Sequence, residues 1–156
     1  MTPNYRLVAT QILSDLPTGW RVTFWAKYGG VTDWERKRIF CPYVRGDVSL
    51  KVLAHEVYGH ALSKPIRPVW WGEVLADRAA IANLRRLGYE VGILALRRCA
   101  RYAARKLFQG VVRGYDGPIP PALRESVRIG RRRGVRAAEL AAQADPAVLA
   151  WLRGAG

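Results

Sequence analysis

The segment that most constrains this chain is 53–62, which contains both of its histidines. Glu56 directly follows His55, and His60 comes five residues after His55, next to Gly59. Small and apolar residues flank the motif on both sides, a pattern that predicts a buried helix rather than a polar loop. Two imidazoles and a carboxylate on one buried helix indicate a candidate metal site, because these groups are common zinc ligands.

The spacing of the two histidines differs from the usual zinc-peptidase motif, in which histidines four residues apart lie on one helix face. Residues five apart on a regular α-helix point about 140° apart, so His55 and His60 would not reach one ion. A π-helical turn with i→i+5 hydrogen bonding would absorb the extra residue, and Gly59 tolerates such a distortion. In an unbroken α-helix, Glu56 and His60 would instead pair on one face.

A second acidic pair follows the histidine motif at helical spacing. Glu73 and Asp77 are four residues apart and share one face of the helix predicted for 73–87. Both carboxylates can therefore address the same site. The two segments together predict two imidazole ligands, one carboxylate ligand, one carboxylate base and one carboxylate behind the ligands.

Both segments resemble helices of the gluzincin metallopeptidases. Residues 53–56 and 59–62 are similar to the active-site helix of that group with one residue inserted, and 73–78 is similar to its Glu-x-x-x-Asp ligand helix. The group includes thermolysin-like and ImmA/IrrE-like peptidases. The His-Glu-x-x-x-His spacing is also similar to that of the much larger TldD-type peptidases. The resemblance covers roughly residues 36–90.

The resemblance implies a role for each residue at a matching position. His55 and His60 would be the first and second ligands of Zn²⁺, and Glu73 the third. Glu56 would be the general base that deprotonates metal-bound water, and Asp77 would accept a hydrogen bond from a ligand imidazole. The implied activity is that of a metallopeptidase acting on a peptide or protein substrate. Other divalent metals suit the same nitrogen and oxygen ligands.

The whole chain, 1–156, is predicted to form a single domain, since half of its residues are hydrophobic. It contains no apolar run long enough for a membrane span and no evident signal peptide, so the cytoplasm of a prokaryote or of a phage-infected cell is expected. Cys41 and Cys99 are too few for a disulfide framework and are expected to be partly buried free thiols. The alternatives are a single disulfide, or Cys99 as a metal ligand.

Residue patterns predict an α+β fold with a basic helical extension, 91–156, and the resemblance implies that 1–90 form a minimal zincin-like core. In the core, a small and mostly antiparallel sheet would pack on the two motif helices. Pro42 places the second predicted strand toward the sheet edge, where an extended peptide could pair with it. The predicted strands are 20–28 and 35–43. The predicted helices are 5–16, 49–63, 73–87, 90–108, 122–133, 135–143 and 146–152.

Basic residues concentrate in the C-terminal half of this chain, whose net charge is +14. Between Arg97 and Arg136, eleven arginines and one lysine stand against two carboxylates. Such a surface attracts nucleic acid or an acidic protein, although a solvated basic face is the simpler alternative. The second hypothesis is therefore a nucleic-acid- or polymerase-binding regulatory protein on a zincin scaffold. Its candidate contact residues are Arg97, Arg101, Arg105, Arg131, Arg132 and Arg133.

Overall fold

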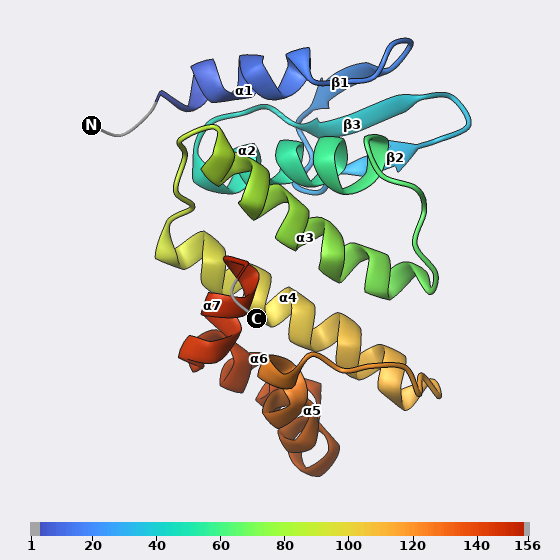
Figure 1. Ribbon diagram of the computed structural model, residues 1–156, viewed down its shortest axis with the longest axis vertical. Coiled ribbons are helices and arrows are strands. Elements are labelled where there is room, and N and C mark those ends of the chain that lie inside the picture. Colours follow the sequence, from blue (N-terminus) through green and yellow to red (C-terminus); the bar gives the residue numbers. More distant parts are fainter. Residues whose placement is uncertain (1–3, 155–156) are drawn as a thin grey trace. The chain divides into compact units, whose positions relative to one another are not determined.

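The computed structural model describes residues 4–154 and confirms an α+β fold (Figure 1). Over these residues it contains three strands, seven α-helices and one π-helix. The chain forms two compact units, and helix α3 (Val69–Arg86) contributes to both. The first unit comprises the chain up to Pro65 together with Leu75–Gly92, and the second comprises Ile66–Val74 and the chain from Ile93 onward. The single-domain organisation stays a prediction.

The first unit contains a mixed three-stranded sheet in the order β1–β3–β2 (Figure 1). Strand β1 (Arg21–Trp25) runs parallel to β3 (Arg38–Pro42), and the short β2 (Val31–Asp33) runs antiparallel to it. The predictions of a mostly antiparallel sheet and of an edge position for the second strand are therefore wrong. Pro42 is the last residue of this central strand, where it pairs with Trp25 of β1 but lies beyond the pairs with β2, which end at Phe40.

Two helical segments pack on this sheet and form the core of the first unit. Helix α2 (Asp47–Ala54) contacts both α1 (Tyr5–Ser14) and β3, and it continues directly into the π-helix η1 (His55–Ala61). The segment η1 in turn contacts β2 and β3. The largest fully buried side chains here come from α1, the central strand, α2 and the later half of α3, and include Ile12, Ile39, Leu50, Leu53 and Leu84.

The second unit confirms a helical C-terminal half. Its helices are α4 (Ile93–Val112), α5 (Pro121–Arg133), α6 (Val135–Ala144) and α7 (Pro146–Leu152), together with the first turn and a half of α3. Helix α6 packs against both α4 and α5. Small buried side chains such as Ala100, Ala103, Ala138 and Ala142 allow these backbones to approach closely.

Neither cysteine is in a disulfide, as the sequence predicts, and both are fully rather than partly buried. Cys41 lies on β3 and Cys99 on α4. Burial, and secondarily the nearby charge of Glu56, raises the pKa of Cys41 to about 12, so this thiol stays protonated near neutral pH. Within residues 4–154, none of the helices combines the length and apolar character that a bilayer crossing needs.

Candidate metal centre

The extra residue between the two histidines is accommodated by the π-helix η1. The amide of Leu62 donates to the carbonyl of Val57, five residues earlier, over 2.9 Å. A π-helical turn contains more residues than an α-helical one, so side chains five apart come to the same side of the helix. The predicted i→i+5 turn is confirmed, and the alternative of an unbroken α-helix is wrong.

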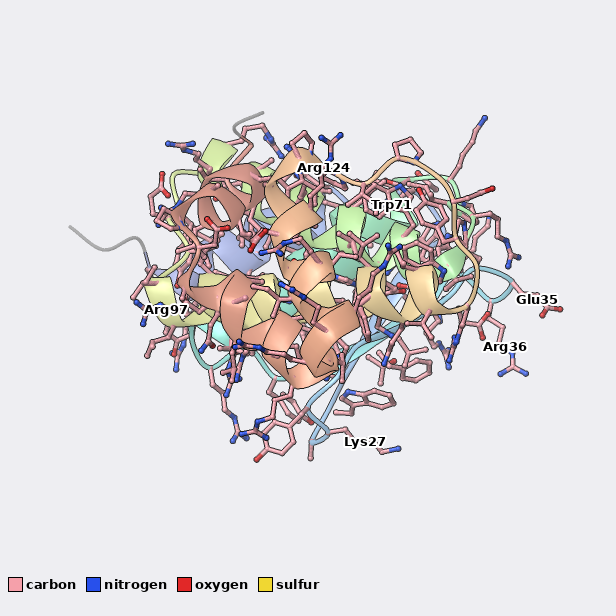
Figure 2. All side chains as sticks on the ribbon, turned by 90° about the horizontal axis from the view of Figure 1, so that it is seen from below. Lys27, Glu35, Arg36, Trp71, Arg97 and Arg124 are labelled. Atoms are coloured by element: carbon pink, nitrogen blue, oxygen red, sulfur yellow. The ribbon has the colours of Figure 1, made fainter. Side chains whose placement is uncertain are left out.

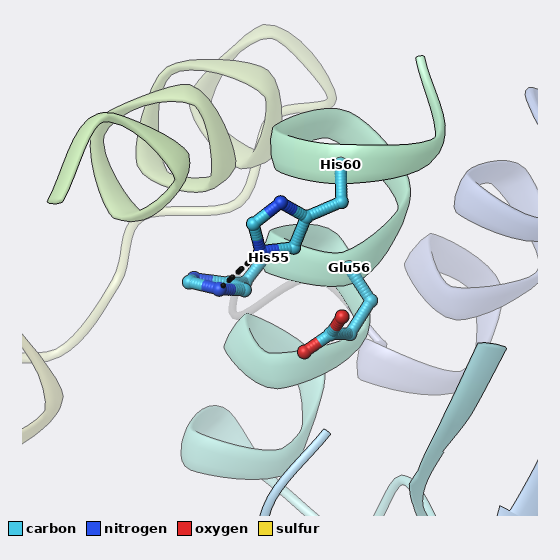
Figure 3. A group of neighbouring side chains, drawn as sticks. All are labelled: His55, Glu56 and His60. Carbon is cyan, nitrogen blue, oxygen red and sulfur yellow. Dashed lines mark hydrogen bonds between the residues drawn. The ribbon is translucent and has the colours of Figure 1, made fainter. Parts of the chain in front are cut away.

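The imidazoles of His55 and His60 consequently face one another (Figure 3). Their Nε2 atoms are 3.1 Å apart, and the side chains are almost entirely buried, with 7% and 8% of the residue surface exposed. Two tetrahedral ligand atoms, each about 2.0–2.1 Å from a zinc ion, would be roughly 3.3 Å apart. The distance between the two Nε2 atoms therefore fits two ligands of one ion.

Glu56 completes a buried group with the two histidines (Figure 3). One potential ligand atom from each of these three residues lies within 4.8 Å of the others, so the group could hold a metal ion. The carboxylate is held from the neighbouring strand, because the Thr32 hydroxyl donates to Glu56 Oε2 over 2.5 Å. Gly30, just before β2, gives this carboxylate its space, since a Cβ there would collide with it.

A buried ion pair supports His55 from the side away from His60. Asp77 Oδ1 lies 2.8 Å from His55 Nδ1 and 2.9 Å from Lys51 Nζ, and Asp77 is completely buried. Burial alone would raise the pKa of Asp77, but the charge of Lys51 and the hydrogen bond from His55 lower it below its usual value. An ionised Asp77 favours the tautomer with a proton on Nδ1, which leaves the Nε2 lone pair of His55 for a ligand bond.

The middle of the π-helix is tied to the end of α1. The hydroxyl of Tyr58 donates to Asp15 Oδ2 over 2.5 Å, and Arg86 from α3 contacts the same oxygen over 3.2 Å. This bond fixes η1 to a residue 43 positions earlier in the chain. The π-helix η1 is therefore stabilised by contacts from outside its own segment.

Three residues that contact this group or the adjacent Asp77 were not predicted from the sequence. Lys51 lies four residues before His55 on the same helical face, so its spacing could have indicated the contact. No local pattern marks Thr32 or Trp34, because the contacts depend on the placement of β2. The indole of Trp34 donates to the carbonyl of His60 over 3.3 Å, and the two rings meet edge to face at 5.3 Å.

The remaining predicted residues lie in the second unit. Glu73 is on the first part of α3, where its Oε2 accepts a hydrogen bond from the Tyr102 hydroxyl over 3.2 Å. Its role as the third ligand stays a prediction, as do the roles of the other predicted site residues. The six arginines are all exposed. On α4 they are Arg97, Arg101 and Arg105, and on α5 they are Arg131, Arg132 and Arg133.

Replacing Gly59 with alanine should destabilise the first unit. An added Cβ would lie 2.7 Å from the backbone Cα of Ala76 on α3, and backbone cannot move aside as a flexible side chain can. Overpacking of this kind costs about 1–3 kcal/mol of unfolding free energy. Thermal unfolding followed by circular dichroism should show a melting temperature lower by several degrees.

The control for this substitution is Gly29→Ala, because a Cβ at Gly29 would meet nothing within 4 Å. That variant should melt close to the wild type. Equal melting temperatures for Gly29→Ala and Gly59→Ala would show that η1 and α3 are not in tight contact at this point.

Comparison of the chain with protein-family models, with curated proteins and with solved structures finds no match. The chemistry of the buried group is therefore the firmest guide to what this chain does.

Proposed function

We propose that this chain is a zinc-dependent peptidase in which His55 and His60 hold the metal ion. The observation that carries the proposal is the 3.1 Å distance between two buried Nε2 atoms, which suits two ligands of one ion. The gluzincin-like sequence of both motif helices supports peptide hydrolysis as the reaction. By the same resemblance, Glu73 would be the third ligand, and other divalent metals are the alternative to zinc.

The protein groups around the histidines suit the proton transfers of hydrolysis. A zinc ion bound here would supply Lewis acidity and would lower the pKa of water. Glu56 would take a proton from the attacking water as the new carbon–oxygen bond forms, and would give it to the nitrogen as the carbon–nitrogen bond breaks. The hydrogen bond from Thr32 orients the carboxylate of Glu56 before the substrate arrives.

The sheet offers a place for an extended substrate beside the buried group. Strand β2 is at one end of the sheet, and it contacts η1. Within the described residues, no strand pairs with its outer side. A peptide could add to this edge by main-chain hydrogen bonds, with specificity from its alternate side chains. The substrate strand would then lie along Val31–Asp33 rather than along the central strand.

Metal content and hydrolysis measured on the same preparation test the proposal. Purified protein supplied with zinc should contain one equivalent of metal and cleave a quenched fluorescent peptide library. Removal of the metal by 1,10-phenanthroline should abolish cleavage, and zinc should restore it. A protein that takes up no zinc, or cleavage that continues after the metal is removed, would exclude this function.

A further inference from the structure

Helix α5 presents a row of arginines on the side opposite its buried face. Arg124, Arg128 and Arg132 repeat every four residues, so they lie within about 80° of one another around the helix axis, and Arg131 lies beside them. We call these four residues the α5 arginine face. All four are exposed, and Arg124 is labelled in the side-chain view (Figure 2). The inner side of the helix consists of Leu123, Ser126, Val127 and Gly130, all buried.

The positive charge of this face is largely uncompensated. Arg128 pairs with Glu125 over 2.6 Å, and both side chains are more than half exposed. Across residues 4–154, no ion pair involves Arg124, Arg131 or Arg132. Like charges four residues apart destabilise a helix, and only those in the last turn benefit from the helix dipole. A polyanion bound along this face would relieve the repulsion.

A row of guanidinium groups along one helix suits a row of phosphates. A guanidinium binds a phosphate through two parallel hydrogen bonds, and arginines one helical turn apart can contact several phosphates at once. Helix α5 contains no aromatic residue on which an unpaired base could stack. Of its larger apolar side chains, Leu123 and Val127 are buried and Ile129 is half-buried, whereas a membrane-surface helix would expose a whole apolar face to the lipid.

We propose that the α5 arginine face binds the phosphate backbone of a nucleic-acid duplex without selecting a base sequence. Contacts to phosphates position a protein on a duplex but do not read its bases. The inference rests only on residues of the second unit and is independent of the metal centre. Either proposal can therefore fail without affecting the other.

The test is fluorescence anisotropy of a labelled 20-base-pair duplex over a range of salt concentrations. The triple variant Arg124→Gln/Arg128→Gln/Arg132→Gln should bind at least tenfold more weakly than the wild type near 0.1 M salt. Each phosphate contact contributes about 0.9 to the slope of log affinity against log salt, so the slope should fall by about 2–3. The corresponding triple Arg→Lys variant should keep the slope, and circular dichroism would verify that both variants are helical.

A matched control variant removes three positive charges from positions outside α5. Arg6, Arg21 and Arg67 are exposed and lie outside α5, and their triple glutamine variant has the same net charge as the test variant. It should bind the duplex within about threefold of the wild type, since it loses only long-range attraction. An equal loss in both variants would mean that net charge alone attracts the duplex, and would overturn the proposal. Tighter binding to single-stranded DNA than to the duplex would also overturn the proposal. Polyglutamate that competes as well as DNA would overturn it too, and would indicate an acidic protein as the partner.

Discussion

Replacement of Glu56 by glutamine is expected to reduce kcat for peptide hydrolysis by roughly 10²–10⁴-fold while leaving the bound metal in place. Glutamine has nearly the same shape as glutamate, and its carbonyl oxygen can still accept the hydrogen bond from Thr32. It cannot accept the proton of the attacking water, so only the proton transfer is lost. The measurements are kcat on a fluorogenic peptide and metal content by inductively coupled plasma mass spectrometry.

The control for this variant is Glu35→Gln, which makes the same change in charge at an exposed position (Figure 2). Its kcat should equal that of the wild type. Unchanged hydrolysis by the Glu56→Gln variant would rule out a general base at this position. Loss of the metal from that variant would instead assign Glu56 as a ligand, since its carboxylate belongs to the same buried group.

Replacement of His60 by alanine is expected to weaken zinc binding by well over 100-fold. Loss of a residue that only orients a ligand costs about 10–100-fold in metal affinity, and loss of a ligand should cost more. Asp77 would still hold the His55 ring in the tautomer that leaves Nε2 available to the metal. The second ligand nitrogen, His60 Nε2 at 3.1 Å from His55 Nε2, would be absent. Competition with a zinc-selective chromophoric chelator would measure the change in Kd.

The matched control for the histidine variant is Ser63→Ala. The Ser63 hydroxyl donates to the carbonyl of Tyr58 over 2.9 Å, so this substitution perturbs the end of the π-helix without removing a candidate ligand. Zinc affinity should then stay within about tenfold of the wild type. Equal affinities for the His60→Ala variant and the wild type would show that the two imidazoles do not share an ion.

The helices and the wide turn were predictable because their signals are local. Two histidines five residues apart cannot reach one ion from an α-helix, and a π-helix is the small distortion that brings them together. Apolar periodicity, proline and glycine placed each helix. Helix α3 begins at Val69 rather than at 73 and α4 ends at Val112 rather than at 108, but other helix ends agree closely. The segment predicted as 122–133, for example, is α5, Pro121–Arg133.

The arrangement of the sheet could not be predicted in the same way. Strand β2 has only three residues, Val31–Asp33, which is too short for an alternating pattern to be recognised. The parallel pairing of β1 with β3 joins residues 17 positions apart, and nothing local distinguishes it from an antiparallel hairpin. The contact from Thr32 to Glu56 depends on that arrangement and was missed for the same reason.

The bond between Tyr58 and Asp15 makes the shape of the histidine segment a property of the folded unit rather than of the segment itself. A short peptide containing only this segment would lack that anchor and would not present its two imidazoles together. If the proposed metal ion binds, its capture and the folding of the first unit would be thermodynamically linked. At a free metal concentration one hundred times Kd, this linkage would add about 2.7 kcal/mol to the unfolding free energy. Proteolysis of the unfolded chain would therefore be slower at a higher free metal concentration.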